Sequence, residues 1–113
     1  MRPVTLPALA SVAASAPVVL DYRSGYPAIG LQLIVTGSNT STVQVTSDDV
    51  FAAGYAPASG NWFPVPIAAL VNATASQNAT LAAAVYTAVR LNMTTFISGG
   101  ATLKIIAAST QGV

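Results

Sequence analysis

The chain has 113 residues, of which 53% are hydrophobic and only 6% are charged, and its net charge is +1. This length fits one domain, and the composition is the reverse of that of a disordered chain, which is poor in apolar residues and rich in charge. The absence of histidine and cysteine excludes a disulfide framework, a zinc site and the usual base of a nucleophilic triad. Four scattered cations do not form the basic footprint of a nucleic-acid-binding protein.

Residues 1–17 carry three prolines and an alanine-rich stretch at 8–16 that could form a short helix. Pro3 and Pro7 interrupt the apolar run of a secretory signal peptide, so we interpret this segment as an extended arm. It lacks a clear apolar stripe for packing on its own domain, and we therefore expect it to lie across a neighbouring subunit. The apolar contacts we expect there are Val4, Leu6 and Leu9. No apolar run reaches the roughly 18 residues of a membrane span.

Two alternating segments, residues 29–36 and 42–47, follow the arm. Each places apolar side chains on one face and polar side chains on the other, as a half-buried strand does. The Gly-Ser-Asn sequence at 37–39 is typical of a turn, because these residues tolerate positive φ. The pattern predicts a β-hairpin, with these side chains facing inward: Leu31, Leu33, Val35, Val43 and Val45.

Residues 48–60 are predicted as a long loop, followed by a short extended piece that its prolines keep out of a central strand. We interpret Trp62 and Phe63 as a plug at one end of the core, the alternative being a surface anchor for a partner or a sugar. Residues 74–80 are polar and predict a loop, whereas residues 81–85 predict a strand.

Residues 88–96 and 101–108 alternate most regularly, and Gly99-Gly100 lies between them. Two period-2 segments around such a turn predict a second β-hairpin. The succession of short strands and turns favours an all-β fold, an antiparallel β-sandwich or jelly roll. We expect this single β-sandwich domain to span residues 18–113, with the extended N-terminal arm at 1–17.

The titratable side chains do not assemble a catalytic site. Asp48 and Asp49 are adjacent, which suits capping of loop amides better than the facing carboxylates of a glycosidase. Lys104 lies on the outer face of a predicted strand, where it is a solubilising or interface charge. We expect Arg90 to pair with Asp48 or Asp49 as a structural contact. The sequence therefore predicts a protein that is not an enzyme and binds neither a metal nor a cofactor.

The low charge of the surface is the most informative property of the composition. A folded monomer of this mass exposes roughly 5,800 Å², and soluble surfaces carry about 25–35% charged residues. Seven charges fall far short of that, so a permanent interface with other protein is the natural explanation. Tyrosines in loops supply contact area with a polar tip. The candidates are Tyr22, Tyr26 and Tyr55.

Three stretches carry a family resemblance. They read TVQVTSDD at 42–49, NWFP at 61–64 and AVRLNMTTFISGGATLKII at 88–106. From Thr36 onward the pattern resembles that of small structural proteins of tailed bacteriophages and is similar to the head decoration, or cement, proteins. The resemblance implies a jelly-roll or β-sandwich subunit that clamps neighbouring capsomers, with the major capsid protein as its partner.

We therefore expect a structural virion protein on the outer surface of an icosahedral capsid, present as a homodimer or homotrimer. It would stabilise the shell by bridging neighbouring capsomers, without contact with nucleic acid or membrane. The alternative is a tail- or fibre-associated binding module that recognises a host surface glycan through Tyr55, Trp62 and nearby Asn and Gln side chains.

Overall fold

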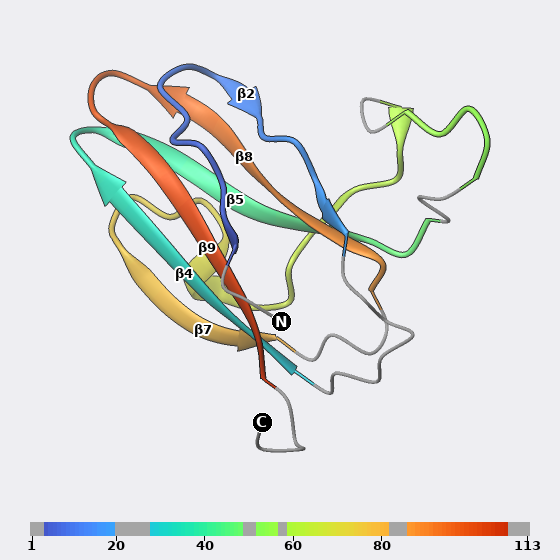
Figure 1. Cartoon of the computed structure of the whole chain (residues 1–113). Helices are drawn as coiled ribbons and strands as arrows, with labels where there is room; N and C mark the ends of the chain where they lie inside the picture. Colours follow the sequence, from blue (N-terminus) through green and yellow to red (C-terminus); the bar gives the residue numbers. More distant parts are fainter. Residues whose placement is uncertain (1–3, 20–27, 49–51, 57–58, 82–85, 109–113) are drawn as a thin grey trace.

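The computed structural model is an antiparallel β-sandwich, which confirms the fold class expected from the sequence (Figure 1). It describes residues 4–19, 28–48, 52–56, 59–81 and 86–108. Sheet A has the order β1 (Val4–Thr5), β9 (Gly100–Ala108), β4 (Ala28–Thr36) and β7 (Gln77–Leu81). Sheet B has β2 (Ala13–Ala14) and β3 (Val18–Val19) beside β8 (Ala88–Phe96), followed by β5 (Asn39–Thr46) and β6 (Phe63–Pro64).

The four long strands form one ribbon that is folded over on itself. β4 pairs with β9 along its whole length in sheet A, and β5 pairs with β8 in sheet B. The ladder passes from Thr36–Gly100 in sheet A to Asn39–Phe96 in sheet B, so both strands change sheets at the same place. The two predicted hairpins are therefore wrong: β4 does not pair with β5, nor β8 with β9. Both glycine-containing turns are present, but each takes the chain from one sheet to the other.

The two corners are joined by hydrogen bonds. The Ser38 N–H donates to Ser98 O (3.1 Å), and the Ile97 N–H donates to Ser38 O (2.9 Å). The buried Asn39 side chain donates from Nδ2 to Thr36 O (2.8 Å) and to Ser98 O (3.1 Å). The hydrogen bonds supply partners for the carbonyls at the corner, as buried backbone groups require.

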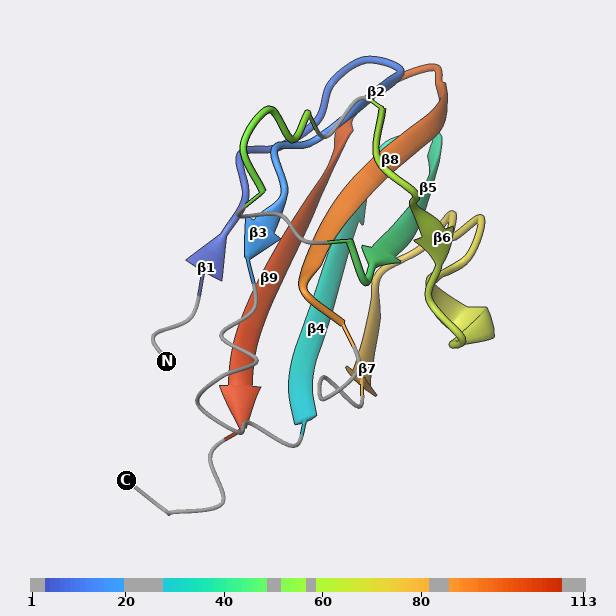
Figure 2. The same cartoon turned by 90° about the vertical axis from the view of Figure 1, so that its right-hand side faces the viewer.

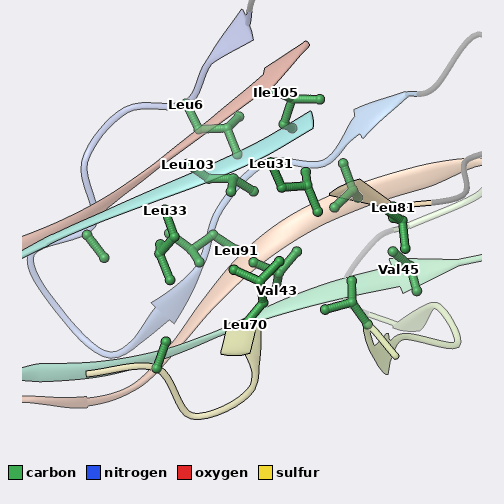
Figure 3. Packing of buried hydrophobic residues seen from close by; sticks show 14 of the residues in the cluster. Leu6, Leu31, Leu33, Val43, Val45, Leu70, Leu81, Leu91, Leu103 and Ile105 are labelled. Atoms are coloured by element: carbon green, nitrogen blue, oxygen red, sulfur yellow. The ribbon is translucent and has the colours of Figure 1, made fainter. Parts of the chain in front are cut away.

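The core lies between the sheets and follows the alternation of the strands. Leu31, Leu33, Leu103 and Ile105 from sheet A face Val43, Val45 and Leu91 from sheet B (Figure 3). Each fully buried side chain of this kind contributes about 1.5–3 kcal/mol by leaving water. The predicted inward faces are thus confirmed, except that Val35 is only partly buried.

The arm lies on its own domain. β1 pairs with β9, Leu9 bridges to Ala101, and β2 and β3 then pair with β8. The arm therefore crosses from the edge of sheet A to the edge of sheet B and covers that side of the sandwich (Figures 1 and 2). Its extended conformation is as expected. The expectation that it gains little by packing on its own domain is wrong, whereas its contact with a neighbouring subunit stays a prediction. Backbone pairing with an open edge needs no apolar stripe, which is why the sequence pattern did not reveal it.

Two further expectations are corrected. Residues 74–80 were expected to be a loop, but β7 covers Gln77–Leu81 and pairs with β4 over five positions. The polar side chains of Asn78 and Thr80 lie on its outer face, where a strand tolerates them. Thr42 and Thr46, on the polar face of residues 42–47, were expected to face solvent, yet both are buried, with 5% and 1% of their surface exposed. A short 3₁₀ helix, η3 (Ala68–Leu70), buries Leu70 against the core.

Candidate functional site

The arm residues expected to contact a partner serve their own domain. Leu6 is only 6% exposed and belongs to the core, and Leu9 packs against it. Val4 is partly exposed beside Ile105 in the β1–β9 pairing. Leu6 is therefore unavailable to a partner. Tyr22 and Tyr26, also expected at an interface, lie outside the described residues.

A second group of predicted residues comes together on the outer face of sheet B. We name Gln44, Tyr55, Trp62 and Arg90 the Trp62 cluster. The Arg90 guanidinium carbon lies 4.4 Å from the centre of the Trp62 ring, and Arg90 Nε donates to Gln44 Oε1 (2.8 Å). This distance is within cation–π range. β8 and β5 position the pair because Gln44 lies opposite Arg90 in the ladder.

Burial lowers the pKa of Arg90 from its ordinary value, and the charge interaction with Tyr55 acts in the opposite direction. The guanidinium stays protonated, since arginine titrates far above neutrality. The Arg90 side chain thus remains a permanent cation, held between a ring face and an amide oxygen. Trp62 is partly buried in this arrangement but is not part of the hydrophobic core.

Phe63 is not a core plug. It lies in the edge strand β6 and is 64% exposed, the second highest exposure among the large hydrophobic side chains of the described residues. The neighbouring Val65 fills the core position instead, next to Val43. Prolines on both sides of Val65 keep this edge strand short.

Asp48 anchors the end of the loop that carries Tyr55. Its Oδ2 accepts from the Asn61 backbone N–H (2.7 Å), and its Oδ1 accepts from Asn61 Nδ2 (3.1 Å). The backbone hydrogen bond from Asn61 is the main reason that the pKa of Asp48 is lowered, with smaller effects from the Asn61 side chain and Thr46. Amide capping by Asp48 is confirmed. The pairing of Arg90 with Asp48 or Asp49 stays a prediction, and Asp49 lies outside the described residues.

Gly60 allows three polar groups to approach the same point. A Cβ on Gly60 would lie 2.5 Å from the Tyr55 hydroxyl, 3.0 Å from Trp62 Nε1 and 3.2 Å from Asp48 Oδ2. The Tyr55 hydroxyl is buried there without a hydrogen-bond partner. The polar groups of Tyr55, Trp62 and Asp48 thus meet at Gly60, which favours a role in holding residues 52–56 and 59–62 against sheet B.

The outer face of sheet A carries an open groove of about 580 Å³, which we name the sheet A groove. It lies over β4, β7 and β9, and its only ionisable lining side chain is Lys104. Ile106 is 46% exposed in it. A Cβ on Gly30 would lie 3.1 Å from Ile106 Cγ2, so the missing side chain at Gly30 lets Ile106 lie close to the sheet. The other exposed lining side chains are Gln32, Asn78 and Thr80.

Sequence reasoning placed Lys104 on this outer face but did not identify the groove. The available signal was Gly30, a glycine inside an apolar strand pattern, which often marks a close approach. The lining residues of the groove include no titratable partner for Lys104. What it offers is a broad, nearly neutral contact surface.

Comparison of the chain with protein-family models, with curated proteins and with solved structures finds no match. Within the described residues, no helix has the length and apolar character to cross a membrane.

Proposed function

We propose that this chain is a structural subunit of a tailed-phage virion that binds the outer surface of the capsid and bridges neighbouring capsomers. In this proposal the sheet A groove is the surface that contacts the major capsid protein. The mechanism is mechanical: burying neutral and apolar surface across capsomer boundaries adds binding free energy to the assembled shell. No catalytic step is involved.

The observation that carries the proposal is the chemistry of the sheet A groove. The chain has a surface of 5913 Å² and a sequence with only seven charged residues. The groove contains one of them, Lys104, together with the partly exposed Ile106. Removing such a face from water costs little desolvation of charge and gains apolar burial at roughly 25 cal/mol per Å² before ordering costs. A protein partner of complementary shape suits this face.

The capsid is proposed as the particular assembly because of the sequence resemblance. Two of the three stretches that carry it form β5 and the β8–β9 corner, and the third contains β6. These are the elements that build the sandwich.

The alternative, a glycan-binding module that uses Tyr55 and Trp62, stays a prediction. One ring face of Trp62 is stacked against Arg90, and the Tyr55 hydroxyl is buried. The Trp62 cluster therefore does not by itself favour a sugar ligand.

The proposal is tested by quantitative mass spectrometry of purified particles. We expect hundreds of copies of the chain per particle, in a fixed ratio to the major capsid protein. A few copies or a dozen would indicate a tail component, and absence from particles would overturn the virion assignment.

A further inference from the structure

We propose that two copies of this chain join through β7, so that their sheets A form one continuous antiparallel sheet across a twofold axis. The dimer does not rest on the proposed function, because it would form in solution without a capsid. Its basis is a difference between β7 and the other edge strands in the described part of the sandwich.

The other edge strands are short and lie close to prolines. β1, β2, β3 and β6 have two residues each. Pro7 lies shortly after β1, Pro17 immediately precedes β3, and Pro64 lies within β6. Very short strands and prolines are devices by which natural sheets prevent a further strand from adding to their edges.

β7 has none of these devices. It has five residues, contains neither proline nor a charged side chain, and pairs with β4 without a register shift. It is the last strand of sheet A, and no described strand lies on its outer side. An edge strand of this length without prolines or charges presents a row of backbone donors and acceptors that suits an added strand.

A second copy of β7 fits this edge in one register. The outer faces of the two sheets A are continuous only if outward-facing residues of one β7 lie opposite outward-facing residues of the other. A slip of one residue would place outward-facing residues opposite inward-facing ones. Full overlap of Gln77–Leu81 then places Ala79 opposite its own copy. In that register Asn78 lies opposite the partner's Thr80, and both of these side chains are exposed on the groove face. An amide facing a hydroxyl is a favourable cross-strand pair.

Charge does not oppose the arrangement. β4, the neighbour of β7, has no charged side chain, and the nearest cation on this face is Lys104 of β9. The two copies of Lys104 would be separated by five strand spacings, about 24 Å at roughly 4.8 Å each. This exceeds the Debye length of about 8 Å at physiological ionic strength. The two sheet A grooves, both of which reach β7, would then lie side by side.

The test is analytical ultracentrifugation of the full chain over a range of concentrations. It includes variants whose effect on dimerisation depends on which residues lie opposite each other across the axis. The double substitution Asn78→Lys with Thr80→Lys places like charges opposite each other twice across the axis. The double substitution Asn78→Lys with Thr80→Asp places opposite charges there instead. Gln32→Lys is the matched control, because it adds a charge to the same face on β4, away from the edge.

We expect the wild type and the Gln32→Lys variant to form dimers. The Lys/Lys variant should raise the dimer Kd about tenfold or more, and the Lys/Asp variant should restore it to near the wild-type value. All altered side chains are exposed, and circular dichroism will verify folding. A monomeric wild type at high concentration would overturn the proposal, and so would equal dimerisation of the Lys/Lys and Lys/Asp variants.

Discussion

Gly37 and Gly99 lie against each other where the two corners of the ribbon cross. A Cβ on Gly37 would lie 2.7 Å from the Gly99 Cα, and a Cβ on Gly99 would lie 2.7 Å from the Gly37 Cα. Both residues have positive φ, of 73° and 76°. The ribbon can therefore pass from sheet A to sheet B in this tight form only because neither position carries a side chain.

Gly99→Ala should destabilise the fold strongly. The new methyl group would overlap the Thr36 carbonyl, in addition to the strain of positive φ. We expect the free energy of unfolding to fall by roughly 3 kcal/mol or more, measured by urea denaturation. Gly54→Ala is the control, since Gly54 has φ of 77° but nothing within 4 Å of its Cβ position. Gly54→Ala should lower the free energy of unfolding by only about 1 kcal/mol. Equal losses in the two variants would contradict the crossing of the corners.

Leu6→Ala should act on stability, because Leu6 belongs to the core of its own domain. We expect a loss of about 2–5 kcal/mol in the free energy of unfolding, from lost burial and the cavity that remains. Val12→Ala, an exposed position in the same arm, should change it by less than about 0.5 kcal/mol. If Leu6→Ala were as mild as Val12→Ala in thermal unfolding, the arm would not be docked as described. Deletion of residues 1–16 removes Leu6 as well, so point substitutions test the role of the arm more cleanly.

Arg90→Lys should disturb the Trp62 cluster. The planar guanidinium stacks on the Trp62 ring and donates to Gln44 at the same time, and an ammonium group cannot do both. We expect a loss of about 1–2 kcal/mol in the free energy of unfolding. The chain has a single tryptophan, so its fluorescence reports on this cluster alone. The emission should shift to longer wavelength as the ring becomes more exposed. Lys104→Arg, on the other sheet, should leave the spectrum unchanged, and an unshifted spectrum in Arg90→Lys would argue against the stacking.

The attachment of the loop through Asp48 should weaken at acidic pH, because the Asp48 carboxylate accepts the hydrogen bonds from Asn61. Hydrogen bonds from Asn61 stabilise the carboxylate and lower its pKa below the ordinary 3.8. The stabilisation is therefore present above the pKa of the unfolded chain, and it is lost as the pH falls through the lower pKa of the folded state. We expect Trp62 fluorescence to change below about pH 3.8 in the wild type. Asp48→Asn should remove that component of the titration. An identical acid titration in both proteins would contradict the role of Asp48.

The sequence predicted the sandwich and most of its inward-facing residues because alternation is a local property. Leu31, Val43, Leu91 and Leu103 could each be assigned to the core from their neighbours in the chain alone. The pairing of strands could not be assigned in this way. A glycine-containing turn between two alternating segments serves a hairpin and a sheet-changing corner equally well, and only the distant partner strand distinguishes them.

The candidate surfaces were predicted less completely, for related reasons. Tyr55 and Trp62 were grouped only in the alternative, glycan-binding hypothesis, whereas the main interpretation placed Trp62 in the core. The stacking of Arg90 on Trp62 depends on the ladder between β5 and β8. Phe63 was assigned to the core because apolar aromatic residues are mostly buried, whereas Val65 occupies the inward position. The sheet A groove requires Gly30, Thr80 and Ile106 to lie on three adjacent strands, and these residues are far apart in the sequence.

The central claim is that the sheet A groove attaches this chain to a capsid. Its most direct test is co-sedimentation of the purified protein with phage heads that lack it, comparing the wild type with Ile106→Glu, which places a charge in the groove at an exposed position. The proposal predicts saturable binding of the wild type and at least about a tenfold weaker affinity for Ile106→Glu, with unchanged folding by circular dichroism. Equal binding of the two proteins, or a wild type that does not bind heads at all, would contradict it.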